Sequence, residues 1–447
     1  MPTLEWIGKS KVINHHQKVP FRVLERKYSF DENGQHSEDN GSENMIIRGD
    51  NLEALKALLP RYEGRVKCIY IDPPYNTGNE GWVYNDNVND PKIKKWLGEV
   101  VGKEGEDLTR HDKWLCMMYP RLMLLQKLLA DDGVIFISID DNELYNLKSV
   151  CDEIFGASCY VSDIAWQRTY STRNDSKGIV NEVEHILVYS KEPEWNPNKL
   201  PRTAEMDAKY KNPDNDVSAW RTSDAFAPGA ATHQGMVYAI QHPFTGKMLY
   251  PSNGACWRYQ QDTMLEIMNG WTKYELQDLH DEKERAHVCG ISPDEVRPDV
   301  KAIVLADPLE VASANAQKVM ERGQWPRFFF TKGGKGGIAR KTYLENVGGR
   351  LPTNFWPFSE TGHTDEAKKE MLAIFDGKAT FDTPKPHRLI EFVLKVAGTQ
   401  DALILDSFAG SGTTAHAVLN MNKADGGHRK FILVEMGDYA DTITAER

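Results

Sequence analysis

An apolar run that stops at two prolines constrains the fold of this chain more than any other stretch. Residues 66–71 read Val-Lys-Cys-Ile-Tyr-Ile, and Asp72, Pro73, Pro74 and Tyr75 follow directly. Such a run of apolar and β-branched residues predicts a buried strand. Proline has no N–H to donate to a central strand, so the chain must leave the sheet at Asp72. Because ligands bind at the carboxyl ends of strands in open α/β sheets, we expect these residues to line a ligand site.

A glycine-rich turn follows a second predicted strand near the end of the chain. Residues 403–405 are Leu-Ile-Leu, and residues 406–413 read Asp-Ser-Phe-Ala-Gly-Ser-Gly-Thr before a predicted helix. The backbone N–H groups of such a turn and the positive end of the helix face a ligand. Glu435 ends the next predicted strand, in place to bind two ribose hydroxyls. The same spacing fits the dinucleotide fingerprint, so a nicotinamide or flavin enzyme and a turn without a ligand both stay open at this point.

Strands and helices alternate on both sides of a long irregular stretch. The expected strands are 45–48, 66–71, 134–139, 160–167, 185–190, 402–405 and 431–434, and the expected helices are 52–59, 114–129, 143–155, 388–396 and 412–419. This order is typical of a parallel sheet with right-handed crossovers. Neither half has enough strands to be stable alone, so the two halves should complete one sheet. We predict an α/β fold, a mostly parallel twisted sheet with helices on both faces and an inserted irregular α+β domain.

Changes in composition predict the domain boundaries. Residues 1–43 are polar and form an expected N-terminal arm, and residues 44–190 form the first half of the sheet. Between 191 and 350 the chain is rich in Pro, Asn, Asp, Gly and Trp and has no long periodic segment, which predicts the inserted domain. Residues 351–447 then supply the second half of the sheet.

The charge balance limits the kind of nucleic-acid binding that the chain can perform. Its net charge of −11 argues against a protein that coats nucleic acid without specificity, but it leaves room for a local basic groove. The candidate lies within residues 328–343, where glycines separate the basic side chains. These candidate DNA contacts are Lys332, Lys335, Arg340 and Lys341. Glycine-rich backbone with interleaved Lys and Arg can lie against phosphates, and a solvated surface loop is the alternative.

Cysteine spacing and hydropathy predict neither a metal site nor a membrane segment. The six cysteines are scattered without a CxxC pair, which indicates reduced, structural thiols. His280, His287, Cys256 and Cys289 match no common zinc-ligand spacing, so we expect no metal. The N-terminus lacks the apolar stretch of a signal peptide, and no apolar run could cross a bilayer, so we expect a cytoplasmic protein.

The two strand-end motifs together decide what the glycine turn leaves open. Asp-Pro-Pro-Tyr at one strand end and Phe-x-Gly-x-Gly after another are the pair typical of amino-methyltransferases that act on DNA bases with S-adenosylmethionine. The chain resembles the β group of DNA N6-adenine methyltransferases and, within it, the Mod subunits of type III restriction–modification systems. The other segments that carry this resemblance are 44–51, 114–129, 134–143, 152–156, 186–190, 256–258, 362–363 and 381–386.

The resemblance implies a Rossmann-like fold that uses S-adenosylmethionine, with the catalytic half at 44–190, a target-recognition domain at 191–350 and the cofactor half at 351–447. It implies a site-specific DNA methyltransferase of a restriction or phage-defence system, in the cytoplasm of a bacterial or archaeal cell. The expected partners are double-stranded DNA, a restriction (nuclease or helicase) subunit and a second copy in a homodimer. In this family the sheet continues after the strand that carries Glu435. A chain that stops at Arg447 is therefore either truncated or lacks an edge strand.

The catalytic motif suits a poor nitrogen nucleophile. The lone pair of an exocyclic amine is delocalised into the base, so the site must pull the amino group toward tetrahedral geometry. Asp72 and the carbonyl of Pro73 can each accept one N–H of the amine. Pro73 and Pro74 also fix the backbone without adding an N–H donor. Tyr75 offers a ring face on which a flipped base stacks, and the methyl group transfers in one direct displacement.

The remaining expected site residues belong to the cofactor. The turn at 406–413 would hold the methionine and ribose portions, and Glu435 the ribose hydroxyls. By resemblance, Thr383 and Lys385 grip the methionine carboxylate, and Asp50 lies near the nucleoside; an exposed lysine in a turn is the alternative for Lys385. The full expected set is Asp50, Thr383, Lys385, Asp406, Phe408, Gly410, Gly412, Thr413 and Glu435.

Two other functions stay open. The first is cytosine-N4 methylation, against which Asp72 counts, because the family associates Asp at this position with adenine and Ser with cytosine. The second is a DNA-recognition subunit with weak or no methylation activity.

Overall fold

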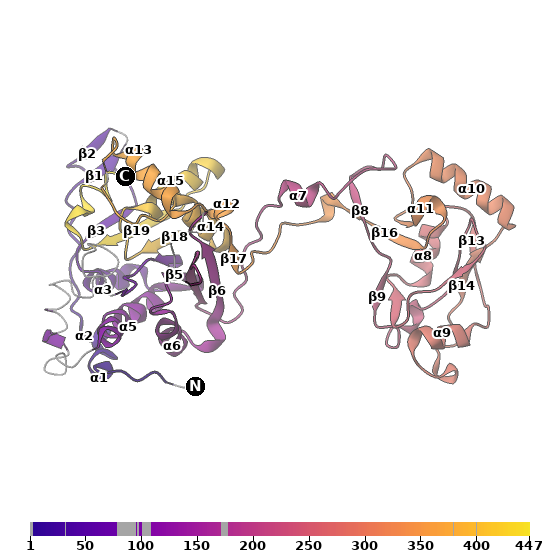
Figure 1. The fold of residues 1–447 in the computed structure, drawn as a ribbon, viewed down its shortest axis with the longest axis horizontal. Helices are drawn as coiled ribbons and strands as arrows, with labels where there is room; N and C mark the ends of the chain where they lie inside the picture. Colours follow the sequence, from indigo (N-terminus) through magenta and orange to yellow (C-terminus); the bar gives the residue numbers. More distant parts are fainter. Residues whose placement is uncertain are drawn as a thin grey trace. The chain divides into compact units, whose positions relative to one another are not determined.

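The computed structural model describes residues 3–31, 33–77, 95, 98–100, 109–170, 178–378, 380–398 and 400–447. The chain forms two compact units (Figure 1). Unit 1 joins residues 1–200 with residues 351–447, and unit 2 is residues 201–350. The residues of unit 2 therefore interrupt the sequence of unit 1.

Unit 1 is built on one sheet of eight strands. Their order is β17 (Phe355–Trp356), β6 (Tyr160–Gln167), β7 (Val183–Ser190), β5 (Leu129–Ile139), β4 (Val66–Ile71), β18 (Leu403–Asp406), β19 (Lys430–Glu435) and β3 (Met45–Arg48). Strand β7 is antiparallel to both of its neighbours, and every other pair in the sheet is parallel. Strands from before and after unit 2 pair directly, so the prediction that both halves complete one sheet is confirmed.

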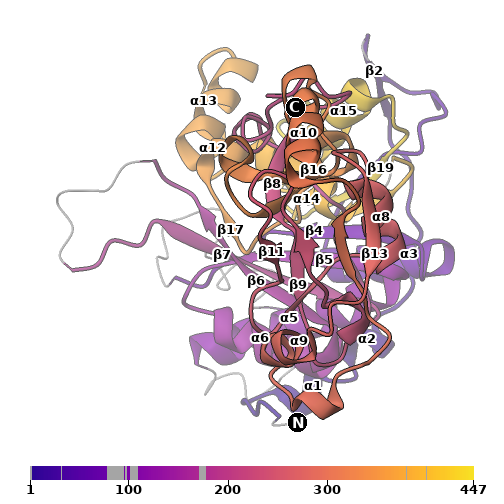
Figure 2. The same ribbon diagram turned by 90° about the vertical axis from the view of Figure 1, so that its right-hand side faces the viewer.

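Helices cover both faces of this sheet. Figure 1 shows α3 (Asn51–Tyr62), α5 (Arg110–Leu128) and α6 (Leu144–Ile154) on one side and α14 (His387–Ala397) and α15 (Thr413–Asp425) on the other, and Figure 2 shows the same layers from the side. Ile69 and Ile71 of β4 join the core under the first group, while Cys68 and Tyr70 join the core under the second. Side chains alternate along a strand, and a strand buried on both faces must be apolar on both. The predicted α/β class is confirmed.

The ends of helix α3 differ from the prediction. The helix begins at Asn51, and Asp50 caps it, because the Asp50 side chain accepts from the N–H groups of Leu52 and Glu53. Pro60 lies inside the helix, which continues to Tyr62. Proline removes a single backbone bond in this last turn, and the burial of the neighbouring leucines outweighs that loss.

The first part of the chain contains four short elements. They are α1 (Lys9–Val12), α2 (His15–Lys18), β1 (Ser29–Asp31) and β2 (Gly34–His36). Helices α1 and α2 pack on α5, and Val12 and Val19 belong to the buried core. Residues 9–19 of the expected arm thus pack against the body of unit 1.

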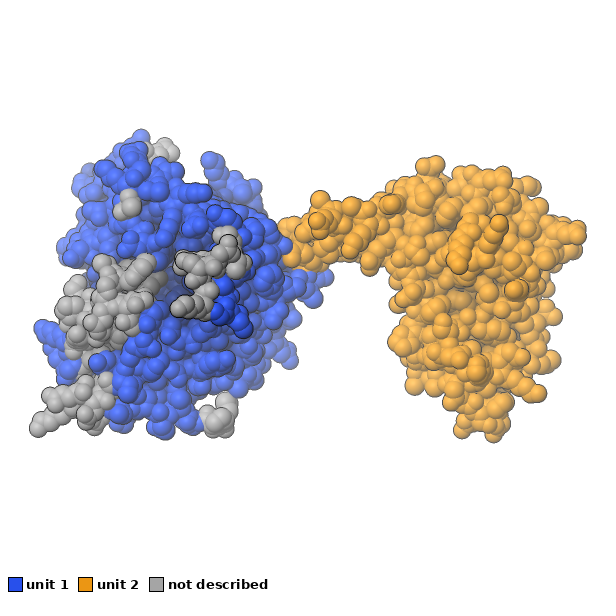
Figure 3. All heavy atoms as spheres, viewed as in Figure 1, with its two compact units in different colours: residues 1–200, 351–447 blue, residues 201–350 orange. Residues whose placement is uncertain are grey.

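Unit 2, shown in orange in Figure 3, has its own hydrophobic core and small sheets. Its strands are β8 (Trp220–Asp224), β9 (Phe226–Pro228), β10 (Ile240–Gln241), β11 (Met248–Leu249), β12 (Ala255–Trp257), β13 (Tyr274–Gln277), β14 (Ala302–Leu305), β15 (Phe328–Phe330) and β16 (Ile338–Tyr343). Its helices are α7 (Ala204–Asp207), α8 (Gln261–Met268), α9 (Glu282–Cys289), α10 (Leu309–Arg322) and α11 (Thr331–Gly334).

Helix α10 corrects the expectation that this region has no long periodic segment. Its buried residues are the alanines Ala312 and Ala316, whereas Leu309 and Val311 are exposed. Alanine adds little to an apolar periodicity, which is why the pattern is hard to see in the sequence. Across the described residues of both units, no helix combines the length and the apolar character needed to span a membrane.

Candidate active site

The two strand-end motifs meet at one edge of the sheet. Strands β4 and β18 are parallel neighbours, with Cys68 opposite Ile404 and Ile69 opposite Leu405. Asp72 follows β4, and Asp406 is the last residue of β18. Both carboxylates therefore lie at the carboxyl ends of adjacent strands.

Asp72 lies in a compact group of four polar side chains. The Lys385 Nζ atom lies 2.8 Å from both Asp72 oxygens and 2.8 Å from the Tyr75 hydroxyl. That hydroxyl is 2.9 Å from Asp72 Oδ1 and 3.2 Å from Glu184 Oε2. Lys385 also pairs with Glu184 at 3.6 Å. Lys385 precedes α14 and Glu184 is in β7, so three separate parts of unit 1 build this group.

The electrostatics of this group favour charged Lys385. Burial opposes its charge, but Asp72 and Glu184 outweigh burial, and the pKa of the ammonium lies above its ordinary value. Burial raises the pKa of Asp72, and the nearby Lys385 opposes this rise. An ammonium that donates to both Asp72 oxygens requires the carboxylate form, so we assign an ion pair here.

The loop after β4 is held by residues that sequence reasoning did not identify. The Trp114 indole N–H donates to the Pro74 carbonyl at 2.6 Å. Asn76 adopts a left-handed φ of 60°, and its amide donates to the buried Glu143 carboxylate. A non-glycine residue at positive φ indicates that its surroundings fix the backbone there. Only the motif itself was visible in the sequence, because these supports come from α5 and from the residue before α6.

Two buried carboxylates shape the glycine turn. Asp406 accepts from the Phe408 N–H at 3.0 Å and from the Thr414 hydroxyl at 2.6 Å. Glu435 accepts from the Gly410 N–H at 2.8 Å through one oxygen and from the Gly437 N–H at 2.7 Å through the other. Burial raises the pKa of Asp406 to about 7 and that of Glu435 to about 7.

Two glycines of the turn have left-handed backbone conformations. Gly410 has a φ of 54° and Gly412 a φ of 79°, a region that other residues rarely adopt. A Cβ atom on Gly412 would lie 2.8 Å from the Thr444 carbonyl oxygen. Arg447 also contacts this turn, because its guanidinium donates to the hydroxyls of Ser411 and Thr413 at 2.9 and 2.8 Å.

The other expected cofactor residues surround this turn. Asp50 pairs with buried Arg121 at 3.3 Å, and Arg121 binds Asn51, whose amide reaches the Ser407 carbonyl at 3.0 Å. The Thr413 hydroxyl lies 3.3 Å from the Lys385 carbonyl, which joins the two cofactor segments. Phe408 packs against the core of unit 1, and Thr383 is half-buried just before Lys385. The ammonium of Lys385 itself lies on Asp72.

One predicted DNA contact is wrong, because Lys341 is fully buried in unit 2. Its ammonium pairs with Asp214 and Asp216 at 2.5 Å each and also donates to the Trp325 carbonyl at 2.7 Å. A fully buried ammonium that already pairs with two carboxylates cannot reach a phosphate. The alternation of strand β16 points Lys341 inward, which the basic run in the sequence does not reveal.

The other three predicted contacts stay accessible. Lys332 and Lys335 are exposed, and Arg340 is half-buried. Arg258 and Arg327 lie close enough to Arg340 to lower the pKa of its guanidinium, after burial, which is the largest cause. Within the described part of the chain, no carboxylate lies at ion-pair distance from these three arginines, and the Arg340 Nε atom is buried without a partner. We call Arg258, Arg327 and Arg340 the arginine cluster.

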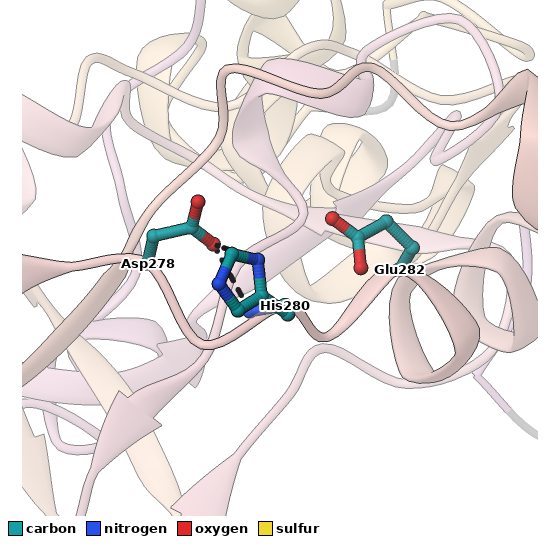
Figure 4. Close-up of side chains that lie close together, drawn as sticks. All are labelled: Asp278, His280 and Glu282. Carbon is teal, nitrogen blue, oxygen red and sulfur yellow. Dashed lines mark hydrogen bonds and ion pairs between the residues drawn. The ribbon is translucent and has the colours of Figure 1, made fainter.

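The cysteines and histidines considered as zinc ligands all belong to unit 2. Cys256 and Cys289 are buried free thiols, and His287 contacts Asn253 instead. Among the described residues, one group of three has ligand atoms within 4.8 Å of one another: Asp278, His280 and Glu282 (Figure 4). Asp278 and His280 are exposed, Glu282 is half-buried, and the group lies at the surface, where carboxylates are common without an ion. We assign no metal to it.

Comparison with known proteins gives consistent matches. The family model described as DNA methylase matches residues 66–446. The StyLTI Mod subunit, a type III restriction-modification enzyme of Salmonella typhimurium, is 34% identical over 89% of this chain and 53% of its own length. The EcoP15I Mod subunit of Escherichia coli is 28% identical over 98% of this chain and 64% of its own length. The type II methyltransferase M.KpnI of Klebsiella pneumoniae is 29% identical over 92% of this chain and 84% of its own length. The chain thus spans between half and two thirds of the two Mod subunits.

Proposed function

This chain belongs to the DNA methylase family, and from that premise we propose that it transfers a methyl group from S-adenosylmethionine to N6 of an adenine flipped out of duplex DNA. The observation that carries the proposal is the pairing of β4 with β18. This pairing brings the catalytic motif and the glycine turn to one edge of the sheet. A nucleophile held at Asp72 and a methyl donor held at the turn would then face each other.

The residues around the glycine turn suit this cofactor. Gly410 and Gly412 allow the tight turn at the start of α15 through their positive φ, and the buried carboxylate of Glu435 lies beside this turn. Backbone N–H groups at a helix start bind carboxylates and hydroxyl oxygens, and a carboxylate binds ribose hydroxyls. When bound, S-adenosylmethionine supplies the electrophilic methyl group. Thr383, Lys385, Asp50, Asp406, Phe408 and Thr413 complete the proposed cofactor residues.

Asp72 and the Pro73 carbonyl act on the adenine amino group. Each accepts one N–H, which draws the nitrogen lone pair out of conjugation and aims it at the methyl donor. Because Lys385 already donates to both Asp72 oxygens, the amino group must share or replace one of these bonds as it enters. Tyr75 is 7% exposed, and the Lys385 ammonium lies 5.0 Å from the centroid of its ring, so the groups packed on this ring must move for a base to stack on it.

Unit 2 is the proposed target-recognition domain. Lys332, Lys335 and the cluster of Arg258, Arg327 and Arg340 would contact DNA phosphates, because an anion relieves the mutual repulsion of the arginines. We further propose that the chain is the modification subunit of a type III restriction system, since both Mod relatives carry that name. A restriction subunit, a second copy of the chain and a location in the cytoplasm of a bacterial or archaeal cell belong to this proposal.

Methyl transfer is tested directly with labelled S-adenosylmethionine and unmethylated duplex DNA. We expect label in N6-methyladenine after digestion to nucleosides and mass analysis. Asp72→Ala should lose roughly 100-fold or more of the rate and keep cofactor affinity, because it removes the acceptor for the amine and leaves the glycine turn intact. Label in N4-methylcytosine would reassign the base, and no label with any DNA would reject the methyltransferase proposal.

A further inference from the structure

Glu184 joins the catalytic group although no sequence motif marks it. It is in β7, the antiparallel strand, and is 8% exposed. One of its oxygens lies 3.2 Å from the Tyr75 hydroxyl, and the other accepts from Arg168 Nη1 at 2.9 Å. A second carboxylate so close to Asp72 is electrostatically unfavourable unless cations compensate it. Lys385 and Arg168 supply that compensation.

The Tyr75 hydroxyl links the two carboxylates. It carries a single hydrogen, yet its oxygen lies within hydrogen-bond distance of both Asp72 and Glu184. Lys385 donates to the same oxygen and so leaves that hydrogen to the carboxylates. The hydroxyl can therefore donate to either carboxylate, and a proton that arrives at one can leave through the other.

We propose that Asp72, the Tyr75 hydroxyl and Glu184 form the path by which the reacting amine releases its proton. This inference rests on the proposed function, because it concerns the proton that methylation of an amine must release. In this path Glu184 acts through the Tyr75 hydroxyl, so it is a positioning residue. Lys385 holds the three oxygen groups in register.

The step balances as follows. The N6 lone pair forms the bond to the methyl carbon, and the carbon–sulfur bond breaks with its electron pair passing to sulfur, which becomes a neutral thioether. As this bond forms, N6 gives one proton to the Asp72 carboxylate, so the methylated amine is left neutral and the proton transfer is part of the step whose rate is measured. Asp72 passes that proton to the Tyr75 oxygen as the Tyr75 hydrogen moves to Glu184. Glu184 releases it to water, and all three groups return to their starting forms.

The path reaches water only beyond Glu184. The side chains of Asp72 and Glu184 are 12% and 10% exposed, whereas that of Arg168, at the far side of Glu184, is 41% exposed. A proton that reaches Glu184 is thus next to a solvated residue. The charged and titratable groups that act on Glu184 or respond to its charge are Asp72, Tyr75, Lys385, Arg168, Asp140 and Tyr70.

Glu184→Gln tests the path in the full chain. The methylation rate of this variant is measured in a single turnover on unmethylated duplex DNA. The measurement covers roughly pH 6 to pH 9 and is made in ordinary and in heavy water. We expect a loss of roughly 10- to 100-fold near neutral pH, partial recovery as pH rises because hydroxide replaces the missing acceptor, and a larger solvent isotope effect than in the wild type. Glu192→Gln is the matched control, since Glu192 is exposed just beyond the same strand.

Tyr75→Phe removes the linking hydroxyl and keeps the ring. It should show the same pH-dependent loss, and combining it with Glu184→Gln should add little, because both changes break one path. An unchanged rate and pH profile in Glu184→Gln would overturn the inference. A loss that is equal at every pH, or fully additive losses, would also overturn it by showing a structural role. A wild-type chain that methylates no DNA would instead reject the proposed function.

Discussion

Lys385 stands between two carboxylates, and its charge controls the ionisation of the nearer one. Burial alone would raise the pKa of Asp72, and Lys385 opposes that rise. Asp72 can accept an amino N–H only as the carboxylate. The side chain expected to hold the cofactor therefore also has a direct influence on the proposed nucleophile site.

Replacing Lys385 with Met should shift the pH dependence of methylation. Asp72 loses its cation, so its pKa rises and more alkaline pH is needed to ionise it; we expect the rising limb to move up by on the order of one to three pH units. The measurement is single-turnover rate against pH. Lys395→Met, an exposed lysine on α14, is the control and should behave as the wild type. If the Lys385 variant methylates DNA more slowly but its rate has the same pH dependence as that of the wild type, Lys385 does not control the ionisation of Asp72.

At the scale of the element, helix α15 is defined by a glycine at each end. Gly412 caps its start and Gly426 its end, and both have a left-handed φ, 79° and 68°. They differ in their surroundings, because a Cβ on Gly412 meets the Thr444 carbonyl oxygen, whereas nothing lies within 4 Å of one on Gly426. Substitutions at these two glycines therefore distinguish the effect of backbone strain from the effect of a side chain that displaces the turn.

Gly412→Ala and Gly426→Ala should therefore differ in cofactor binding. Each adds left-handed strain of about 1–2 kcal/mol and should lower thermal stability. Only Gly412→Ala displaces the proposed cofactor turn, so we expect its affinity for S-adenosylmethionine to fall at least about tenfold, a loss of about 1.4 kcal/mol. Thermal unfolding and calorimetric titration measure the two effects. Equal affinity in both variants would argue against cofactor binding at this turn.

At the scale of the whole molecule, the two units divide the proposed work between chemistry and recognition. The site of unit 1 is built entirely from residues of unit 1, and the arginine cluster belongs entirely to unit 2. Substitutions in the site of unit 1 should therefore alter methylation and spare DNA binding. Substitutions in the arginine cluster of unit 2 should alter DNA binding and spare cofactor binding.

The double variant Arg258→Ala, Arg327→Ala should weaken DNA binding and keep cofactor affinity. Removing two phosphate contacts should lower the slope of log affinity against log salt by about one for each arginine. DNA binding is measured at several salt concentrations. Arg297→Ala is the matched control, because this exposed arginine of unit 2 is already paired with Asp299 at 2.6 Å. Equal salt slopes in both proteins would place the DNA contacts elsewhere.

Much of unit 1 follows from local sequence. Strands 45–48, 66–71 and 160–167 are observed with the predicted bounds. Strand 66–71 is almost entirely buried, and such a strand needs the short apolar run that marks it in the sequence. The prolines after Ile71 and the glycines after Asp406 fix where two strands end. Helix α10 was missed because its buried face is made of alanine, and its formation depends on packing in unit 2.

The two motifs, their places at strand ends and the order of the halves are already specified in the sequence, because proline, glycine and apolar periodicity act over a few residues. Which side chains meet depends on the tertiary structure. It set Lys385 against Asp72 and brought Glu184 to Tyr75, and it turned Lys341 inward toward Asp214. Such contacts join residues far apart in the chain, and no local pattern encodes them. The stretch that ends at Asp72 thus specified a ligand site, and the fold supplied the charges around it.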